Sequence, residues 1–232
     1  MHRLDEEVNF KPSSGWLSGL ASALVATLCF AEAPAGEWNV IDEERGITVS
    51  RREQPGCGLP AFRGKGPVRG GVLQILAMML DSDSVEHWAY GVDEAHRIKR
   101  INENEDLIYL YSDVPWPVRD RDMVLRRRVE VVKPGEEFHI HLRCEPASAP
   151  EVSGTVRVKK CESGFHLRRL DQSNTEIDYE MTLDPAGLLP KWAGSYVAKH
   201  VPFKTLVAIE ERVVETRGQY EAVVQRWSTA TF

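Results

Sequence analysis

Hydrophobic and polar residues alternate along much of this chain between residues 97 and 183. In the segment Phe138–Cys144, apolar side chains at every second position are separated by His139, His141 and Arg143. Successive side chains of a strand point to opposite faces, so this segment is predicted to be a strand with one wet face. Similar segments follow one another at short spacing, at residues 97–101, 107–111, 123–132, 138–144, 151–159, 165–170 and 176–183. Short connections between consecutive strands predict an antiparallel sheet.

The hydrophobic period becomes helical at two places. From Gly71 onward, apolar residues recur at helical spacing as far as Leu80, and residues 81–84 then supply the cap of a second short helix that carries Trp88. Between Leu206 and Trp227, apolar residues recur at three- or four-residue steps with one seven-residue gap. This second pattern predicts an amphipathic helix of roughly 25 residues, about 37 Å long, that Pro202 starts or kinks.

A long antiparallel sheet followed by one long amphipathic helix has a natural packing solution, in which the sheet curves around the helix. A helix that does not fill the concave side of the sheet leaves an internal cavity. The predicted fold class is therefore α+β, with a curved antiparallel β-sheet wrapped around a long C-terminal α-helix and a cavity between them, the arrangement known as a helix grip.

The first 35 residues do not fit this domain. Residues 16–30 form an apolar run that is short for a membrane span, and residues 33–35 read Ala-Pro-Ala, an A-x-A cleavage signal. We therefore expect a signal peptide over residues 1–35, a mature domain over residues 36–232, and a periplasmic or secreted protein. The flank at residues 1–15 is more acidic than basic, which leaves a buried or membrane-associated N-terminal helix as the alternative. The protein would be cytoplasmic if the signal is not functional.

Composition narrows the class of protein. The chain has 232 residues, of which 42% are hydrophobic and 28% charged, as in one soluble globular domain. Its net charge of −6 argues against nucleic acid as a partner. Cleavage would leave Cys57, Cys144 and Cys161, an odd number. Cys144 and Cys161 end two predicted strands and could meet, although spacing alone does not establish a disulfide.

Residues 114–124, VPWPVRDRDMV, carry the most specific signal in the chain. The two prolines hold a loop extended, and Trp116 between them is a large apolar residue of a kind that surface loops usually lack. Strand alternation then puts Arg121 on the apolar face with Met123 and Leu125. An arginine there must be paired or line a polar cavity. One interpretation is that Arg121 pairs locally with Asp120 or Asp122.

The alternative is that Arg121 points into the cavity and meets either a carboxylate or the polar end of a ligand. The acidic residues considered as partners are Glu94, Glu103, Glu105 and Asp106. The same alternation puts Arg127 on the apolar face too, and a bulge or a strand end outside the grip would remove that conflict. The whole run Arg126–Arg128 is interpreted as a solvated edge, with contact to anionic lipid headgroups as the alternative.

Residues 114–124 resemble a segment of the StAR-related lipid-transfer (START) domain family, in which a proline-rich turn is followed by Arg-Asp and a hydrophobic strand. A second similar segment runs from Asp184 to Trp192, followed by Tyr196 and residues 202–206. The resemblance covers about residues 37–228 and is of the bacterial stand-alone type. It implies a helix-grip fold, an inward arginine at the Arg-Asp position, and a lipid or other hydrophobic small molecule held in the cavity.

The leading functional hypothesis is a non-enzymatic, monomeric carrier that binds its ligand without a cofactor or metal and contacts a membrane transiently. The ligand is expected to enter between the loop at residues 115–117 and the helix start at residues 192–202. The side chains expected to bind it are Trp88, Tyr109, Tyr111, Trp116, Arg121, Met123, Met181, Trp192, Tyr196, Phe203 and Leu206.

Two other classes of function remain open. A polyketide cyclase or aromatase could share the fold, but several titratable groups would have to converge in the cavity, and only Arg121 and His200 are candidates. An envelope-interaction protein with an incidental cavity is the third class. His139 and His141 form a potential metal pair, but without a visible third ligand they are interpreted as exposed histidines. No nucleophile elbow or phosphate-binding loop is present in the sequence.

Overall fold

The alternating segments form one ten-stranded sheet in the computed structural model, which describes residues 36–54, 59–186 and 191–230. The strands are β1 (Asn39–Glu44), β2 (Ile47–Arg52), β3 (Ala61–Arg69), β4 (Glu94–Arg100), β5 (Glu105–Ser112), β6 (Arg121–Lys133), β7 (Glu137–Cys144), β8 (Val156–Arg157), β9 (Lys160–Arg169) and β10 (Asn174–Asp184). Their order is β1-β2-β3-β10-β9-β7-β6-β5-β4, with β8 beside β6. The β6–β8 pair is parallel, and the pairs along the main path are antiparallel.

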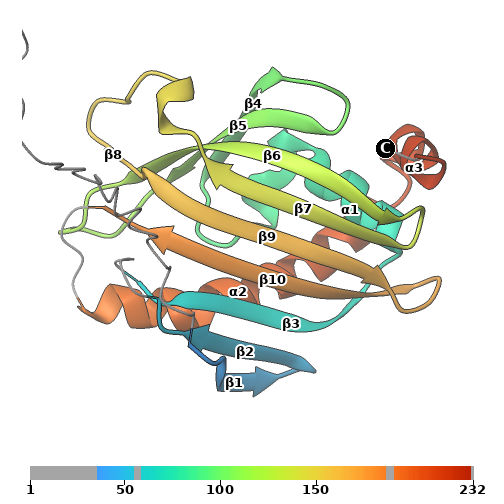
Figure 1. Ribbon diagram of the computed structural model, residues 1–232, viewed down its shortest axis with the longest axis horizontal. Coiled ribbons are helices and arrows are strands. Elements are labelled where there is room, and N and C mark those ends of the chain that lie inside the picture. Colours follow the sequence, from blue (N-terminus) through green and yellow to red (C-terminus); the bar gives the residue numbers. More distant parts are fainter. Residues whose placement is uncertain (1–35, 55–58, 187–190, 231–232) are drawn as a thin grey trace, which may run out of the picture. The chain divides into compact units, whose positions relative to one another are not determined.

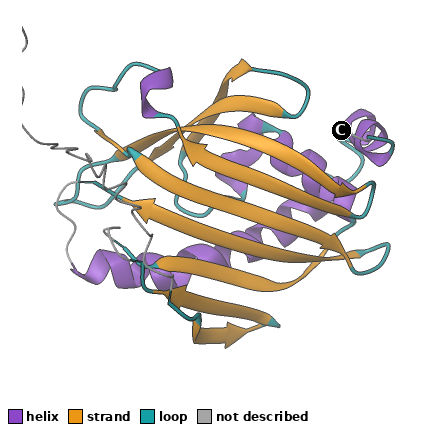
Figure 2. Cartoon of the chain, viewed as in Figure 1, coloured by secondary structure: helices purple, strands orange, loops and turns teal. Residues whose placement is uncertain are grey.

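The helices lie against one face of this sheet, which we call the inner face (Figures 1 and 2). They are α1 (Val72–Leu80), the 3₁₀ turn η1 (Ser82–His87), α2 (Lys191–Glu215) and α3 (Glu221–Ser228). A further 3₁₀ turn, η2 (Pro146–Ser148), lies in the connection between β7 and β9. The α+β fold with a sheet that grips C-terminal helices is therefore confirmed.

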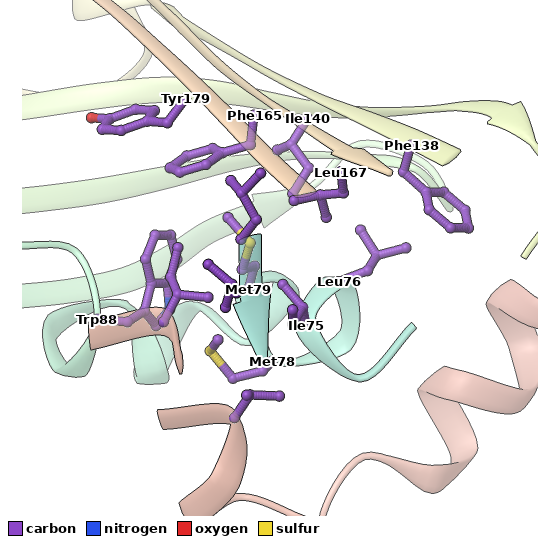
Figure 3. Packing of buried hydrophobic residues seen from close by; sticks show 14 of the residues in the cluster. Ile75, Leu76, Met78, Met79, Trp88, Phe138, Ile140, Phe165, Leu167 and Tyr179 are labelled. Carbon is purple, nitrogen blue, oxygen red and sulfur yellow. The ribbon is translucent and has the colours of Figure 1, made fainter. Parts of the chain in front are cut away.

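The hydrophobic core lies between the inner face and the helices, because alternate strand residues all point to that side. From the strands it includes Leu125, Val129, Phe138, Ile140, Phe165, Leu167, Ile177 and Tyr179, and from α1 it includes Ile75, Leu76, Met78 and Met79. Figure 3 shows these two groups facing one another. From α2, Leu206 and Ile209 are fully buried in the same cluster.

A glycine allows α2 to approach the sheet closely. A Cβ atom added to Gly64 of β3 would lie 2.9 Å from Cβ of Pro202 in α2, closer than side chains tolerate. The glycine-rich stretch of β3 thus has a packing role, as expected for glycine inside a strand. Pro202 lies inside α2 and does not begin it.

The prediction of one helix of roughly 25 residues, from about Pro202 to Trp227, was wrong at both ends. The main helix begins eleven residues before Pro202, at Lys191, and ends at Glu215, and α3 is a separate element. Between them Gly218 adopts a φ of +81°, a left-handed conformation that glycine reaches without steric strain and that ends helices. The seven-residue gap in the apolar pattern, from Val213 to Tyr220, coincides with this break.

The expected signal peptide and its cleavage signal lie outside the described residues. Within the part of the chain that is described, no helix is both long and apolar enough to cross a membrane.

Candidate functional site

Three aromatic rings form an array on the inner face. The ring of Phe165 stacks on that of Tyr179, with centroids 4.3 Å apart and the planes 4° from parallel. Trp88, which follows η1, meets Phe165 edge to face at 5.8 Å. Figure 3 shows the three rings at one end of the core, beyond the aliphatic residues of α1. The strands β9 and β10 supply two of the rings, so the sheet register determines their position.

Two polar atoms of this array, Nε1 of Trp88 and the hydroxyl oxygen of Tyr179, lack a strong hydrogen-bond partner among the described residues. Nε1 of Trp88 is buried without a hydrogen-bond acceptor among the described residues. Among the described residues, the hydroxyl of Tyr179 donates only to the thioether sulfur of Met181, 3.4 Å away, and burial raises the pKa of Tyr179. An unpaired buried donor costs on the order of 1–3 kcal/mol. Both groups therefore retain hydrogen-bonding capacity that the described residues do not use.

Arg121 is buried at the start of β6, on the inner side of the strand with Met123 and Leu125. Its guanidinium donates to the carbonyl oxygens of Arg119 and Ala186, while Nε is buried without a hydrogen-bond partner among the described residues. Burial, together with the charge of Arg119, lowers the pKa of Arg121. The side chain is therefore a desolvated cation with spare hydrogen-bonding capacity.

No acidic residue in the described segments forms an ion pair with Arg121. Of the partners considered from the sequence, Glu103 pairs with Arg226, Glu105 with Arg126, and Asp106 with Arg97 and Arg127, while Glu94 forms no ion pair in the same segments. Local pairing of Arg121 with Asp120 or Asp122 is not observed either. Asp122 pairs with Arg157, and Asp120 accepts hydrogen bonds from the Tyr111 hydroxyl and the Val114 amide.

Arg127 also lies on the apolar face of β6, and its charge is paired there by contacts that the sequence did not reveal. The residue is 3% exposed and donates to both carboxylate oxygens of Asp106, at 2.9 and 2.7 Å. It also donates to the carbonyl oxygens of Met79 and Leu80 at the C-terminal end of α1, and to the hydroxyl of Ser82. The Arg127 side chain therefore caps carbonyl groups at the C-terminal end of α1, where a positive charge is favourable. Neither a bulge nor a strand end is needed to explain an arginine on the apolar face.

A second buried ion pair lies on the outer face of the sheet. Arg157 donates to both carboxylate oxygens of Asp122, at 3.0 and 2.7 Å, and to carbonyl oxygens of residues 146, 149 and 150. These bonds hold the connection between β7 and β9 over the start of β6. Sequence reasoning missed this pair, because Arg157 lies in a segment that was predicted only as a strand.

The remaining predicted site residues are not all brought together. Met123, Met181 and Phe203 pack against the core, and Leu206 is inside it. Tyr109 and Tyr111 lie on the outer face, because Ile108 and Leu110 between and beside them point inward. Tyr109 stacks on His96, and the hydrogen bond to Asp120 raises the pKa of Tyr111 to about 12. These two tyrosines therefore do not line the inner face.

Two more predicted residues are exposed. Trp116 is 90% exposed in the loop before β6, and its peptide bond to Pro117 is cis. Tyr196 is 45% exposed on α2, where its hydroxyl lies 2.5 Å from that of Tyr90. Lys204 donates to the same Tyr90 hydroxyl, which links α2 to the loop after η1. The side chain of Trp192 lies outside the described residues.

The start of β6 and the end of β10 lie at one end of the sheet, together with the beginning of α2 (Figure 1). The end of β7 and the beginning of β9 meet there too, and a disulfide joins Cys144 to Cys161. Both cysteines pack against the core. We call this region the Arg121 end of the grip. It includes Arg121, the disulfide and the Trp116 loop.

Residues 31–213 match the family model of the START domain. The chain belongs to the START domain family. An uncharacterized protein of Pseudomonas aeruginosa is 29% identical over 175 residues, which cover 75% of this chain and 85% of that protein. The phosphatidylcholine transfer protein of Rattus norvegicus is 23% identical over 168 residues, 71% of this chain and 78% of that protein.

The fold is also that of a solved family member. The crystal structure of a STAR-related lipid transfer protein fragment from Xanthomonas axonopodis superposes with a TM-score of 0.69 at 24% identity, over 76% of this chain and 98% of that chain. START domains bind lipids or other hydrophobic ligands. The inner face described above is therefore the candidate ligand site of this chain.

Proposed function

We propose that this protein is a non-enzymatic carrier that binds one amphiphilic lipid between the sheet and α2. Its apolar part would contact the core residues around Phe165 and Tyr179, and its polar part would lie at the Arg121 end of the grip. Apolar burial alone contributes about 25 cal/mol per Å², so a lipid chain can be bound tightly without any chemistry. The observation that carries this proposal is the buried Arg121 without an acidic partner in the described segments.

A phospholipid is the ligand class that fits these groups best. A desolvated guanidinium whose Nε has no partner in the described segments favours an anionic oxygen, and a phosphate offers bidentate acceptors to arginine. The similarity to a phosphatidylcholine transfer protein supports the same class. Nε1 of Trp88, which has no acceptor among the described residues, and the weakly bonded Tyr179 hydroxyl would serve acceptor atoms deeper in the interior, such as ester carbonyls.

Ligand entry is proposed at the Arg121 end of the grip, between the Trp116 loop and the first turns of α2. Loops and helix ends open at lower free-energy cost than paired strands. An exposed tryptophan at that position is suited to the interface of a membrane, where its amphipathic ring is favoured. Export is part of the same proposal, and the Cys144–Cys161 disulfide supports an oxidising compartment.

The test is native mass spectrometry of the protein after incubation with phosphatidylcholine vesicles, in parallel with an equilibrium binding assay using a fluorescent phosphatidylcholine. The Arg121→Met variant should bind about tenfold or more weakly, because a hydrogen bond to a charged group contributes about 1.5–3 kcal/mol. Arg143→Met, which removes an exposed arginine of β7, is the matched control and should bind like the wild type. Equal affinity in both variants would remove Arg121 from the site, and no lipid adduct in the wild type would contradict the carrier.

A further inference from the structure

The outer face of the sheet carries a cluster of histidine and glutamate side chains, on the side opposite to the lipid site. His139 of β7 lies directly across from His166 of β9 on one side and Glu130 of β6 on the other. Glu137 and His141 flank His139 at alternate positions of β7 and point to the same side. We call these five residues the histidine cluster. The hairpin of β6 and β7 supplies four of these residues and β9 supplies His166, so the linear pair His139 and His141 shows only part of the cluster.

The atoms of the cluster are close enough to share one ion. Rings of His139 and His166 have their centroids 4.2 Å apart, and Nε2 of His166 lies 2.6 Å from Oε1 of Glu137. One potential ligand atom from each of Glu137, His139 and His166 lies within 4.8 Å of the others. A bound ion would draw these atoms in by modest side-chain rotations, because the strand backbones are already fixed by pairing.

The chemistry of these donors selects a class of metal. Two imidazoles and one carboxylate suit Zn²⁺ and the late divalent transition metals, and they are poor ligands for Ca²⁺ or Mg²⁺. Metal binding requires neutral imidazoles. The cation opposite Glu137, Arg168, is already hydrogen-bonded to Glu176.

We propose that Glu137, His139 and His166 form a binding site for one Zn²⁺ ion that bridges β7 and β9, with water completing the coordination. A second set, Glu130, His139 and His141, shares the central histidine and is also compact. The first set is favoured because all three of its residues are partly buried, whereas Glu130 and His141 are exposed. Less side-chain entropy is then lost when the ion binds.

The experiment uses the full chain without a polyhistidine tag, stripped of metal by chelation, with free thiols alkylated so that Cys29 and Cys57 do not bind. Titration with Zn²⁺ against a chromophoric chelator should show one site per chain. Loss of a group that merely orients a ligand typically weakens metal binding 10–100-fold, so His139→Gln and His166→Gln should each weaken it by about tenfold or more. Glu137→Gln should weaken it in the same direction.

Two control variants make the assignment specific. His87→Gln removes an exposed histidine of η1 and should leave the affinity unchanged, whereas an equal loss in that variant would show non-specific binding and overturn the site. His141→Gln should have the smaller effect. A large loss in His141→Gln with none in His166→Gln would overturn the proposed ligand set, and the absence of saturable Zn²⁺ binding in the wild type would overturn the site itself.

Circular dichroism of each variant verifies folding. A Cu²⁺-loaded sample gives an independent readout, in which electron paramagnetic resonance should lose one imidazole coupling in His166→Gln.

Discussion

At the scale of single residues, three buried arginines of this protein have three different roles. Arg127 is paired with Asp106 and completes the end of α1, and Arg157 is paired with Asp122 and holds a surface segment. Arg121 is buried without an acidic partner in the described segments. Because a buried cation without an anion is costly, the unpaired arginine is the one that points to a ligand.

The Asp122–Arg157 pair gives a stability prediction. The Asp122→Asn variant should lose about 3 kcal/mol of unfolding free energy, because removing one partner leaves a buried charge uncompensated. The side chains of the pair are 0% and 2% exposed, so solvent screens them little. Urea unfolding followed by far-ultraviolet circular dichroism measures the change.

The control for this variant is an exposed ion pair. Lys133→Met breaks the pair of Lys133 with Glu136 and should change stability by less than about 1 kcal/mol. Similar effects of Asp122→Asn and Lys133→Met would show that the buried pair contributes no more than a surface pair.

At the scale of elements, the disulfide joins the end of β7 to the beginning of β9 across 17 residues of sequence. A crosslink of that span restricts the unfolded chain and stabilises the fold by about 3 kcal/mol in the loop-entropy account. Reduction of the wild type should therefore lower the urea midpoint. The Cys144→Ala/Cys161→Ala double variant should unfold at that lower midpoint with or without reductant. A midpoint of the wild type that does not respond to reduction would contradict a stabilising disulfide.

The Trp116 loop gives a kinetic prediction. If this loop contacts the membrane during exchange, Trp116→Ala should slow transfer of a fluorescent phosphatidylcholine between vesicles several-fold. Equilibrium binding should be unchanged, since the side chain is 90% exposed and lies away from the core. Val40→Ala, which truncates an exposed apolar residue on the edge strand β1, should transfer lipid at the wild-type rate. A wild-type rate in Trp116→Ala would place membrane contact elsewhere.

At the scale of the whole molecule, the proposal of an exported carrier predicts a shortened chain. Protein isolated from its host should begin at residue 36, because the apolar run of residues 16–30 and the Ala-Pro-Ala signal precede that point. Intact-mass measurement of the purified protein reads this directly, and the disulfide should be found oxidised in the same sample. Recovery of the 232-residue chain with its own N-terminus from the cytosol would reject export.

The sequence by itself determined the fold class and the family. Period-two alternation predicted the sheet, the C-terminal apolar stripe predicted the helix that it grips, and residues 114–124 with residues 184–206 carried the resemblance to START domains. These signals are local, because alternation and helical period depend on neighbours within one element. The break at Gly218 was missed because apolar spacing on either side of it continues the same stripe.

Only the tertiary structure decided which side chains meet. Alternation alone put Arg121 and Arg127 on one face, but it could not show that Asp106 and the end of α1 satisfy one of them. It also could not place Tyr109 and Tyr111 on the outer face, because an aromatic residue fits either side of a strand. The pairings Asp122 with Arg157, Cys144 with Cys161 and His139 with His166 join segments 35, 17 and 27 residues apart. Such contacts follow from strand register and sheet order, which no single segment of the sequence contains.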